Sequence, residues 1–369
     1  MNILILNWRD IKNPKSGGAE ILTHEIAKRW IKKGHQVTLF SAMFENGPSE
    51  EVIDGVNFIR SGHPDVRSLF SSVQFQAFLY YQKNKGKFDA VVDEIHGFPF
   101  FTPWYVKEKK VVLICEVANE LWTEMFGPLG ILGRLVEWFY FRFVYTNIPY
   151  LTISNSTKDE LLKEGVRRNL ITVLPMGLTF PNNLKKQKKE KDPTLIFVGR
   201  LSKSKGIEDA IKAFEKILRD NFNAKLWIVG NGEKKYITEL KEMAEKINVL
   251  DKITFWGFVT DEKKFELMGK SHILLVPSIK EGWGLTVPEA GLVGTPAIGY
   301  DVAGLREVIK NGKTGYLTSK NNQSELAEAT SSLLKNKSEY KKLSENAKKL
   351  SLSYNWDRTA QAALGIILR

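Results

Sequence analysis

Cysteine is almost absent from this chain, whose 369 residues include one, Cys115. A single thiol cannot form an internal disulfide or complete a metal site built from several cysteines, so both are excluded. A reducing, cytoplasmic location is the simplest interpretation. The N-terminus has neither the basic segment nor the apolar run of a signal peptide, and no stretch is long and apolar enough to span a bilayer. We therefore expect the chain to begin with a strand.

Acidic residues are outnumbered, with 42 Asp and Glu against 54 Lys and Arg and a formal net charge of +12. This balance favours anionic partners, namely nucleotides, anionic lipid surfaces or nucleic acid. The basic charge is not interleaved with an organised pattern of aromatic residues that could stack on bases. We therefore expect no nucleic-acid partner.

The length and the pattern of the chain predict two domains, because one hydrophobic core rarely serves so many residues. Short apolar strands alternate with amphipathic helices along residues 1–181 and again along 194–352. The lysine-rich stretch 182–193 between them is typical of a linker. The sequence thus predicts an α/β fold with two doubly wound, Rossmann-like sheets facing across a cleft. Residues 353–369 are expected to form a closing helix.

The most informative segment is a glycine-rich stretch in which two carboxylates, Glu281 and Glu289, stand eight residues apart. We expect a turn and then a helix that begins near Thr286, so that unpaired amides and the helix dipole face a phosphate or a polyhydroxylated ligand. The residues of this turn and helix start are Gly282, Trp283, Gly284, Leu285 and Thr286. A second interpretation stays open, because Thr286 and Glu289 also match a helix capping box.

A cationic loop stands upstream of this segment. A short apolar strand ends at Gly199, Arg200 and Lys205 follow, and an amphipathic helix starts near Gly206. The planar guanidinium of Arg200 can donate to two phosphate oxygens at once, and the ammonium of Lys205 is a mobile charge at a helix N-terminus. Because open parallel sheets bind ligands at the carboxyl ends of their strands, the two segments together predict a diphosphate site.

The loop after the first strand reaches its glycines late, at Gly17 and Gly18. A dinucleotide-binding dehydrogenase would place Gly-x-Gly-x-x-Gly directly after that strand, so this class is disfavoured. Both glycines stand where a helix begins, and their amides are suited to a phosphate. The alternative is an ordinary helix start with Ser16 as its N-cap.

Residues 129–145 are apolar on nearly every side and include several aromatic residues with Arg134 and Arg142. We predict a buried helix from this pattern. The same composition also suits a membrane interface, and that alternative stays open.

Four motifs in combination resemble a known family. They are Ser-Gly-Gly-Ala-Glu at 16–20, Gly-His-x-Val-Thr at 34–38, Gly-Arg-Leu-x-x-x-Lys-Gly at 199–206 and Glu-x7-Glu at 281–289. Over nearly its whole length the chain resembles the retaining nucleotide-sugar glycosyltransferases of family 4, whose fold is called GT-B. The resemblance implies transfer of a sugar from a nucleoside diphosphate, more often UDP than GDP, to an acceptor hydroxyl. It also implies that the last helix crosses back to the first domain.

The resemblance assigns roles to the motif residues. Glu281 and the amides from Gly282 to Leu285 would hold hydroxyls of the donor sugar, and Glu289 would accept hydrogen bonds from the ribose. The glycine loop at 16–20 would lie at the donor phosphate and the acceptor.

No two aspartates stand two residues apart, so the Asp-x-Asp metal motif of the other large glycosyltransferase fold is missing. We expect a metal-independent enzyme without a cofactor, in which Arg200, Lys205 and helix N-termini stabilise the leaving diphosphate. Phe258 and Val259 follow a strand and would contact the base, although apolar residues in that place also suit a core.

The chain departs from the family pattern near the sugar. Many relatives carry a histidine just after the fifth strand, where this chain has Cys115 and Glu116. A carboxylate at Glu116 suits hydrogen bonds to sugar hydroxyls or stabilisation of positive charge at the anomeric carbon. His96, after the fourth strand, is a second candidate, and its alternative role is to cap local backbone.

Two other classes stay open beside the transferase. A sugar-nucleotide epimerase can share the two-domain plan and would need no acceptor, and a non-catalytic protein that binds anionic surfaces would rest on the basic charge. For a transferase we expect a glycan or lipid-linked acceptor in cell-surface polysaccharide or glycolipid synthesis. A peripheral contact with the inner face of an anionic membrane is compatible with this.

Overall fold

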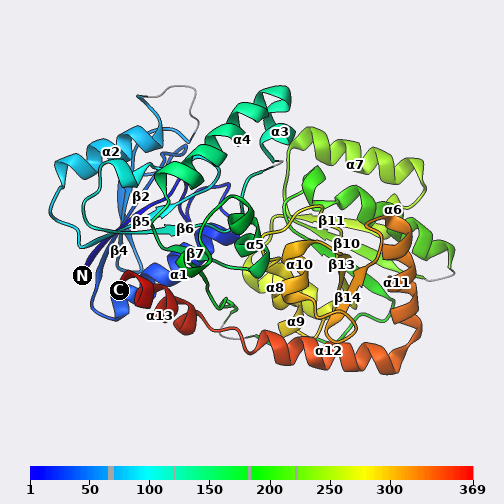
Figure 1. Ribbon diagram of the computed structural model, residues 1–369. Helices are drawn as coiled ribbons and strands as arrows, with labels where there is room; N and C mark the ends of the chain where they lie inside the picture. The colour runs from blue at the N-terminus through cyan, green and yellow to red at the C-terminus, as the bar shows by residue number, and fades with distance from the viewer. Residues whose placement is uncertain (65–69, 120, 182–183, 221–222, 369) are drawn as a thin grey trace. The chain divides into compact units, whose positions relative to one another are not determined.

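The computed structural model describes residues 1–64, 70–119, 121–181, 184–220 and 223–368. It divides into two compact units. Unit 1 consists of Met1–Gly177 and Asn355–Arg369, and unit 2 of Leu178–Tyr354. Each unit is a sheet with helices packed on its two sides (Figure 1). The predicted pair of Rossmann-like α/β domains is therefore confirmed.

The sheet of unit 1 has eight strands in the order β3-β4-β2-β1-β5-β6-β7-β8 among the described residues. All neighbours run parallel except β3 and β4. The helices and strands of this unit are β1 (Asn2–Leu6), α1 (Gly18–Lys32), β2 (Gln36–Ser41), β3 (Glu50–Ile53), β4 (Val56–Arg60), α2 (Val73–Lys83), β5 (Ala90–Glu94), β6 (Lys109–Leu113), α3 (Leu121–Phe126), α4 (Gly130–Phe139), a π-helical turn (Tyr140–Val144), β7 (Tyr150–Thr152), α5 (Asn155–Lys163), β8 (Ile171–Val173) and α13 (Trp356–Ile367).

The last helix, α13, packs against α1 within unit 1 (Figure 1). The indole Nε1 of Trp30 on α1 donates to the carbonyl of Ala360 at 2.9 Å. Arg29 Nε also donates to Asp357 Oδ1 at 2.6 Å. The end of the chain thus returns to the unit that contains its beginning, as the family resemblance implied.

The antiparallel hairpin of β3 and β4 departs from the predicted alternation, because these two strands follow one another without a helix between them. Asp54 and Gly55 turn the chain with positive φ angles of 50° and 82°. This pair of left-handed residues is the geometry that two-residue hairpins favour. The polar strand Glu50–Ile53 gives little hydrophobic signal because it lies at the sheet edge, with partly exposed side chains.

The sheet of unit 2 has six parallel strands in the order β11-β10-β9-β12-β13-β14 among the described residues. Its helices and strands are β9 (Thr194–Val198), α6 (Ile207–Arg219), β10 (Lys225–Val229), α7 (Lys234–Lys246), β11 (Ile253–Gly257), α8 (Asp261–Lys270), β12 (Ile273–Val276), α9 (Thr286–Leu292), β13 (Ala297–Tyr300), α10 (Ala303–Val308), β14 (Gly315–Thr318), α11 (Gln323–Lys335) and α12 (Lys337–Ser351). Helix α6 shows why the pattern was predictable: Ile207, Ile211, Phe214 and Ile217 recur at helical spacing and are buried in one core.

Part of the stretch predicted as a linker packs on unit 2, while Asn182 and Asn183 lie outside the described residues. Leu184 joins a small apolar cluster, and the amide of Glu190 donates to the carbonyl of Lys270 at 2.9 Å. Lys189 Nζ donates to the carbonyl of Ser271 at 2.5 Å and to Thr295 Oγ1 at 2.6 Å. Composition suggested a solvated tether, but these backbone and hydroxyl acceptors hold the lysine-rich chain against the domain.

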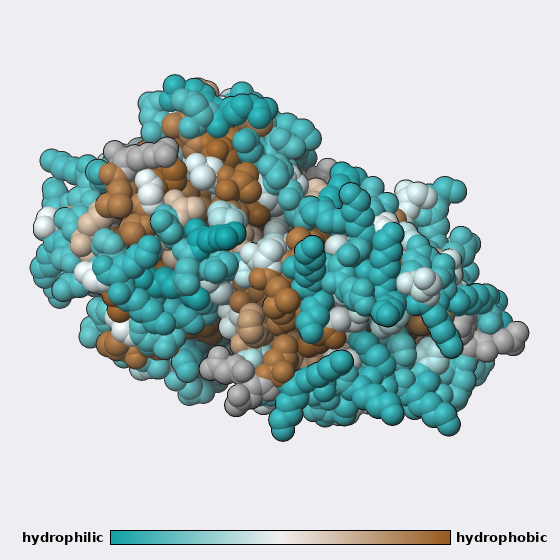
Figure 2. All heavy atoms as spheres, turned by 90° about the horizontal axis from the view of Figure 1, so that it is seen from below, coloured by the Kyte–Doolittle hydropathy of each residue, from teal (hydrophilic) through white to brown (hydrophobic). Residues whose placement is uncertain are grey.

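The segment 129–145 is not the buried helix that we predicted. It forms α4 and the π-helical turn, and much of its apolar surface is exposed, including Leu132 at 62%. No helix of the described residues is long and apolar enough to cross a membrane. On the face seen in Figure 2, hydrophilic residues cover much of the surface and apolar residues gather in several patches.

Lys189 makes the stability of the protein depend on pH. Part of its side chain stays exposed, yet burial around Nζ lowers the pKa from 10.5 to about 7. Between these values the unfolded chain binds a proton that the folded chain does not, so stability rises with pH, by at most about 1.4 kcal/mol per pH unit.

We expect Lys189→Met to remove this rise between about pH 7 and about pH 9, as measured by urea unfolding. The exposed Lys191 provides the control, and Lys191→Met should keep the wild-type slope. Equal slopes in the two variants would contradict the assignment.

Candidate active site

The predicted donor residues of unit 2 lie at one edge of its sheet. All six strands run parallel, so their carboxyl ends meet there. Arg200 follows β9, Phe258 follows β11, and the loop containing Glu281 follows β12. Because β9 and β12 are hydrogen-bonded neighbours, the two motif loops emerge side by side. This is the position at which open parallel sheets bind their ligands.

An ion pair joins the two motifs. Lys205 Nζ donates to Glu281 Oε1 at 2.6 Å, and Ser278 Oγ donates to the same oxygen at 2.9 Å. The amide of Ile279 also donates to the carbonyl of Ser204 at 2.9 Å, which ties the two loop backbones together. The sequence had assigned the lysine to phosphate and the glutamate to sugar, and the structure brings both groups into direct contact.

Gly206 allows this contact between the loops. Its φ is +67°, and a Cβ built on it would stand 1.9 Å from the carbonyl oxygen of Pro277. A side chain at this position would therefore push the loop after β12 away from the loop after β9. The glycine of the Gly-Arg-Leu-x-x-x-Lys-Gly motif is required by packing as well as by backbone conformation.

The turn around Glu281 contains a residue that packs in the domain and glycines that its backbone conformation requires. The side chain of Trp283 is buried, and its ring meets Tyr354 edge to face at 5.0 Å between centroids, so this side chain serves packing. The predicted role of the Trp283 amide toward the donor is a property of the backbone and stays a prediction. Gly284 has a φ of +82°, and Gly304 approaches so closely that a Cβ on it would stand 2.0 Å from the carbonyl oxygen of Glu281. The backbone of the turn is thus held from both sides.

Glu289 is not part of a capping box. Helix α9 begins at Thr286 as predicted, but its N-cap is Leu285 and no side chain caps it. The buried Glu289 instead accepts a hydrogen bond from Lys264 Nζ at 2.9 Å, and Lys264 also pairs with Asp261 at 3.0 Å. Burial raises the pKa of Glu289, and the charge of Lys264 offsets part of that rise. Lys264 gave no sequence signal because its spacing to Glu289 belongs to no motif.

Phe258 is exposed over 85% of its surface, so the interpretation of this residue as part of a core is wrong. Val259 beside it is half-buried. An exposed aromatic ring at the carboxyl end of β11 is available for stacking on a flat ligand. The assignment of both residues to the base stays a prediction.

A third loop at this edge was missed by sequence reasoning. After β10 the chain reads Gly230-Asn231-Gly232, and the amide of Leu201 donates to the carbonyl of Asn231 at 2.9 Å. A Cβ on Gly230 would stand 1.8 Å from the carbonyl oxygen of Gly199. The loop therefore braces the backbone before Arg200. The sequence feature that could have indicated this loop is the pair of glycines just after a strand.

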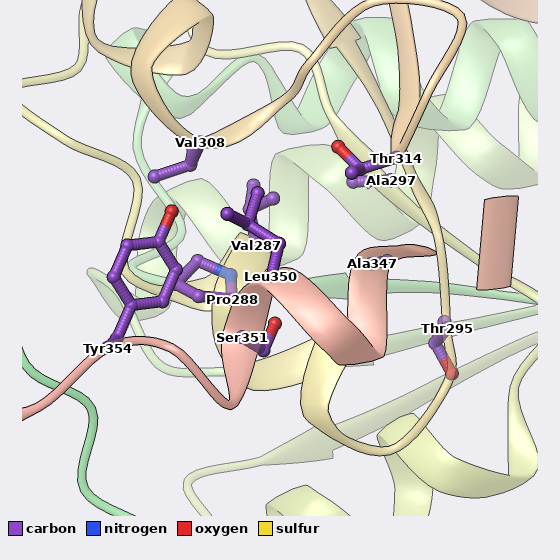
Figure 3. A pocket seen from close by; sticks show the side chains of 10 residues that line it. All are labelled: Val287, Pro288, Thr295, Ala297, Val308, Thr314, Ala347, Leu350, Ser351 and Tyr354. Atoms are coloured by element: carbon purple, nitrogen blue, oxygen red, sulfur yellow. The ribbon is translucent and has the colours of Figure 1, made fainter. Parts of the chain in front are cut away.

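One cavity lies near α9, lined by Val287 and Pro288 together with residues from α12 (Figure 3). Its volume is about 10 Å³, which is room for no more than one water molecule. The carboxylates of Glu281 and Glu289 are absent from its lining. We regard it as a packing defect rather than a ligand site.

At the carboxyl edge of the unit 1 sheet, His96 is held by a buried carboxylate. His96 Nε2 lies 3.0 Å from Glu94 Oε1, and the other carboxylate oxygen accepts from Asn7 Nδ2 at 2.7 Å and Thr23 Oγ1 at 2.6 Å. The imidazole also stacks on Trp8 with centroids 5.4 Å apart. The Glu94 carboxylate and the Trp8 ring therefore hold His96 in place. Glu94 escaped the sequence analysis because it is part of an apolar strand.

The predicted phosphate loop of unit 1 begins α1, but its N-cap is Gly17 rather than Ser16. The amide of Gly17 donates to Glu20 Oε2 at 2.7 Å, so this donor has a partner within the chain. Gly18, at the first position of the helix, is exposed. The amide of Gly17 is thus engaged in the described structure, and its role toward a phosphate stays a prediction.

Cys115 and Glu116 follow β6 at the same edge. Burial, together with the charges of Glu94, Glu20 and Glu116, raises the pKa of the Cys115 thiol well above its usual value. A thiol that stays protonated is a poor nucleophile, so Cys115 is unsuited to covalent catalysis. Its backbone carbonyl accepts from Thr157 Oγ1 at 3.0 Å. The next residue, Glu116, is half-buried.

Comparison with known proteins places these features in a family. The model described as Glycosyltransferase Family 4 matches residues 16–179, and the model described as Glycosyl transferases group 1 matches residues 180–350. An uncharacterized glycosyltransferase of Methanocaldococcus jannaschii is 25% identical over 99% of this chain and 97% of its own length. N-acetyl-alpha-D-glucosaminyl L-malate synthase of Bacillus anthracis is 32% identical over 43% of this chain and 40% of its own.

Solved structures with the same fold cover the whole chain. Sucrose-phosphate synthase from Thermosynechococcus elongatus superimposes with a TM-score of 0.81 at 18% identity, covering 99% of this chain and 98% of its own. HepE from Anabaena, in complex with UDP and glucose, gives 0.77 at 17% identity, covering 100% and 99%. At these identities the likeness establishes the fold, which is GT-B.

Because the matching family models and relatives are glycosyltransferases, the protein is a glycosyltransferase that uses a nucleotide-sugar donor. The chain belongs to the GT-B glycosyltransferases of the group 1 and family 4 type, as the four sequence motifs had indicated.

The close approach at Gly206 can be tested by substitution. Gly206→Ala should destabilise the protein by about 1 kcal/mol through its positive φ and by about 1–3 kcal/mol more through the clash with Pro277. Gly312 is the matched control, because its φ is +70° and a Cβ there would meet nothing within 4 Å among the described residues.

Urea unfolding of Gly206→Ala and Gly312→Ala measures the difference. If both variants lose the same stability, the carbonyl of Pro277 does not constrain this position.

Proposed function

We propose that the protein is a retaining, metal-independent glycosyltransferase that transfers a sugar from UDP to an acceptor hydroxyl of a glycan or lipid-linked acceptor. The observation that carries the proposal is the contact of Lys205 with Glu281 at the edge where Arg200 also emerges. It places the ammonium of Lys205 beside a carboxylate suited to sugar hydroxyls, in the loop that Arg200 begins. The choice of UDP as the nucleotide of the donor is supported by HepE, whose solved complexes contain UDP or UDP-glucose.

The proposed chemistry needs no protein nucleophile. The bond from the anomeric carbon to the diphosphate breaks, the acceptor oxygen attacks from the same face, and a departing phosphate oxygen takes the acceptor proton. Negative charge then grows on the leaving group, where Arg200 and Lys205 act. Charge-assisted hydrogen bonds of this kind contribute roughly 1.5–3 kcal/mol each, and they act most where charge develops in the transition state.

Glu281 has two functions in this scheme. It holds the ammonium of Lys205 at the sheet edge before the donor arrives, and its carboxylate accepts hydrogen bonds from sugar hydroxyls. Glu289 is buried beside Lys264, so it reaches the ribose only at an oxygen that the lysine leaves available. A role for His96 or Glu116 near the sugar belongs to the same proposal, with Glu94 orienting the imidazole.

Binding of the donor is the first test. We expect UDP and UDP-sugars to raise the melting temperature in the presence of EDTA, and to do so more than GDP or ADP at equal concentration, since a ligand that binds the folded state stabilises it. Stabilisation only after a divalent cation is added would contradict metal independence. Conversion of a sugar nucleotide to an isomer without acceptor would identify an epimerase instead.

Arg200→Ala tests the proposed stabilisation of the leaving group. We expect kcat to fall by roughly a hundredfold while KM for the donor changes little, because the interaction strengthens in the transition state. The measurement is release of UDP from the sugar nucleotide. Lys203→Ala, which removes an exposed cation of the same loop, should leave both constants within about twofold. Unchanged turnover in Arg200→Ala would remove this residue from the active site.

A further inference from the structure

Helix α4 is amphipathic in the opposite sense to an ordinary surface helix. The residues that it turns inward are Gly130 and Glu137, and Gly133 is half-buried beside them. Large apolar side chains occupy the solvent side. A helix of a globular domain usually turns its apolar stripe to the core and its charges to water. This inversion requires an explanation.

The inward side is fixed by contacts that only these residues can make. A Cβ on Gly130 would stand 2.1 Å from the carbonyl oxygen of Trp122, and one on Gly133 would stand 2.4 Å from the ring of Trp122. The buried carboxylate of Glu137 accepts from the amides of Ala118 at 2.9 Å and Asn119 at 2.8 Å, and from Trp122 Nε1 at 3.1 Å. The helix therefore cannot rotate to bury its apolar side without breaking this network.

The outward side forms a continuous apolar surface, which we call the α4 face. Its members are large, exposed hydrophobic residues on or next to the helix: Leu129 (71%), Ile131 (57%), Leu132 (62%), Leu135 (56%), Trp138 (43%), Phe139 (45%) and Phe143 (60%). Single exposed hydrophobic residues are ordinary, but contiguous patches of this kind mark an interaction site. A groove of about 300 Å³ continues the face and is lined in part by Ile131, Leu135 and Trp138.

The exposed charges of helix α4 and the turn after it have one sign, while the half-buried Glu164 lines the adjoining groove. Arg134 and Arg142 are exposed within the α4 face, and the Cζ atom of Arg142 lies 5.5 Å from the centre of the Trp138 ring. Between residues 126 and 143 the sequence holds one carboxylate, and that is the inward Glu137. Arginine side chains can lay their stems along an apolar surface and extend the guanidinium toward anionic groups. Leucine, phenylalanine and tryptophan with flanking arginines are typical of helices that lie in a lipid interface.

We infer that the α4 face docks unit 1 on the surface of an anionic bilayer. The apolar side chains enter the boundary between headgroups and acyl chains, and Arg134 and Arg142 pair with lipid phosphates. A net charge of +12 on the chain adds a long-range attraction of the same sign. The inference uses no residue of the donor site, so it stands or falls independently of the proposed function.

Vesicle sedimentation tests the docking surface with the full chain. We expect the protein to bind vesicles of phosphatidylcholine mixed with phosphatidylglycerol, and to bind pure phosphatidylcholine more weakly. Leu132→Ser should lower the partition coefficient by roughly tenfold, because one large apolar side chain no longer enters the interface. Arg134→Gln should lower it by roughly fivefold on anionic vesicles only, with a weaker dependence on salt.

Leu352→Ser is the matched control for Leu132→Ser. Leu352 follows α12 in unit 2 and is exposed to 61%, against 62% for Leu132. The control should bind vesicles like the wild type, and both variants should keep the wild-type circular dichroism spectrum and a cooperative thermal transition. A retained cooperative transition shows that a loss of vesicle binding is not a loss of folding.

Three results would overturn the inference. The wild type could fail to bind anionic vesicles, or Leu132→Ser and Leu352→Ser could bind equally well. Sedimentation equilibrium could also show a dimer that Leu132→Ser converts to a monomer, in which case a second copy of the chain covers the α4 face.

Discussion

The close approach of two loop backbones organises the candidate site in unit 2. Gly206 lies against the carbonyl of Pro277, and this places Lys205 within 2.6 Å of Glu281. The contact is possible because β9 and β12 are neighbours in the sheet although two strands intervene between them in sequence. A crossover of this kind marks the topological switch point of a doubly wound sheet, where ligands bind. The chemistry of the site therefore follows from the strand order.

The two glutamates of the Glu-x7-Glu motif differ in their surroundings. Glu281 is partly exposed and shares its oxygen with Lys205 and Ser278, while Glu289 is buried with Lys264. Buried ion pairs rarely add net stability, because removing two charges from water offsets their attraction. Keeping such a pair beside a binding edge is consistent with a functional purpose. Both carboxylates are thus held by partners within the chain, and under the proposed function this would reduce the reorganisation needed during catalysis.

The sequence predicted the features that depend on local pattern. Alternating strands and helices gave both sheets, and motif spacing gave Arg200, Lys205 and Glu281, which the fold brings to one edge. It did not predict contacts made by residues outside any motif, such as Lys264 with Glu289 or Glu94 with His96. Those pairings are set by tertiary packing, and their spacing along the chain has no period.

The error at α4 shows what apolar periodicity can and cannot establish. A segment that is apolar on nearly every side has no preferred side from hydrophobicity alone, and burial was the simplest prediction. The information lay in the minority residues: Gly130, Gly133 and Glu137 fall on one side of a helix at spacings of three and four. Small residues permit a close approach and a buried carboxylate needs several donors, so this side must face the protein. The large apolar side chains are then left outward, and a contiguous exposed patch of this kind marks an interaction site.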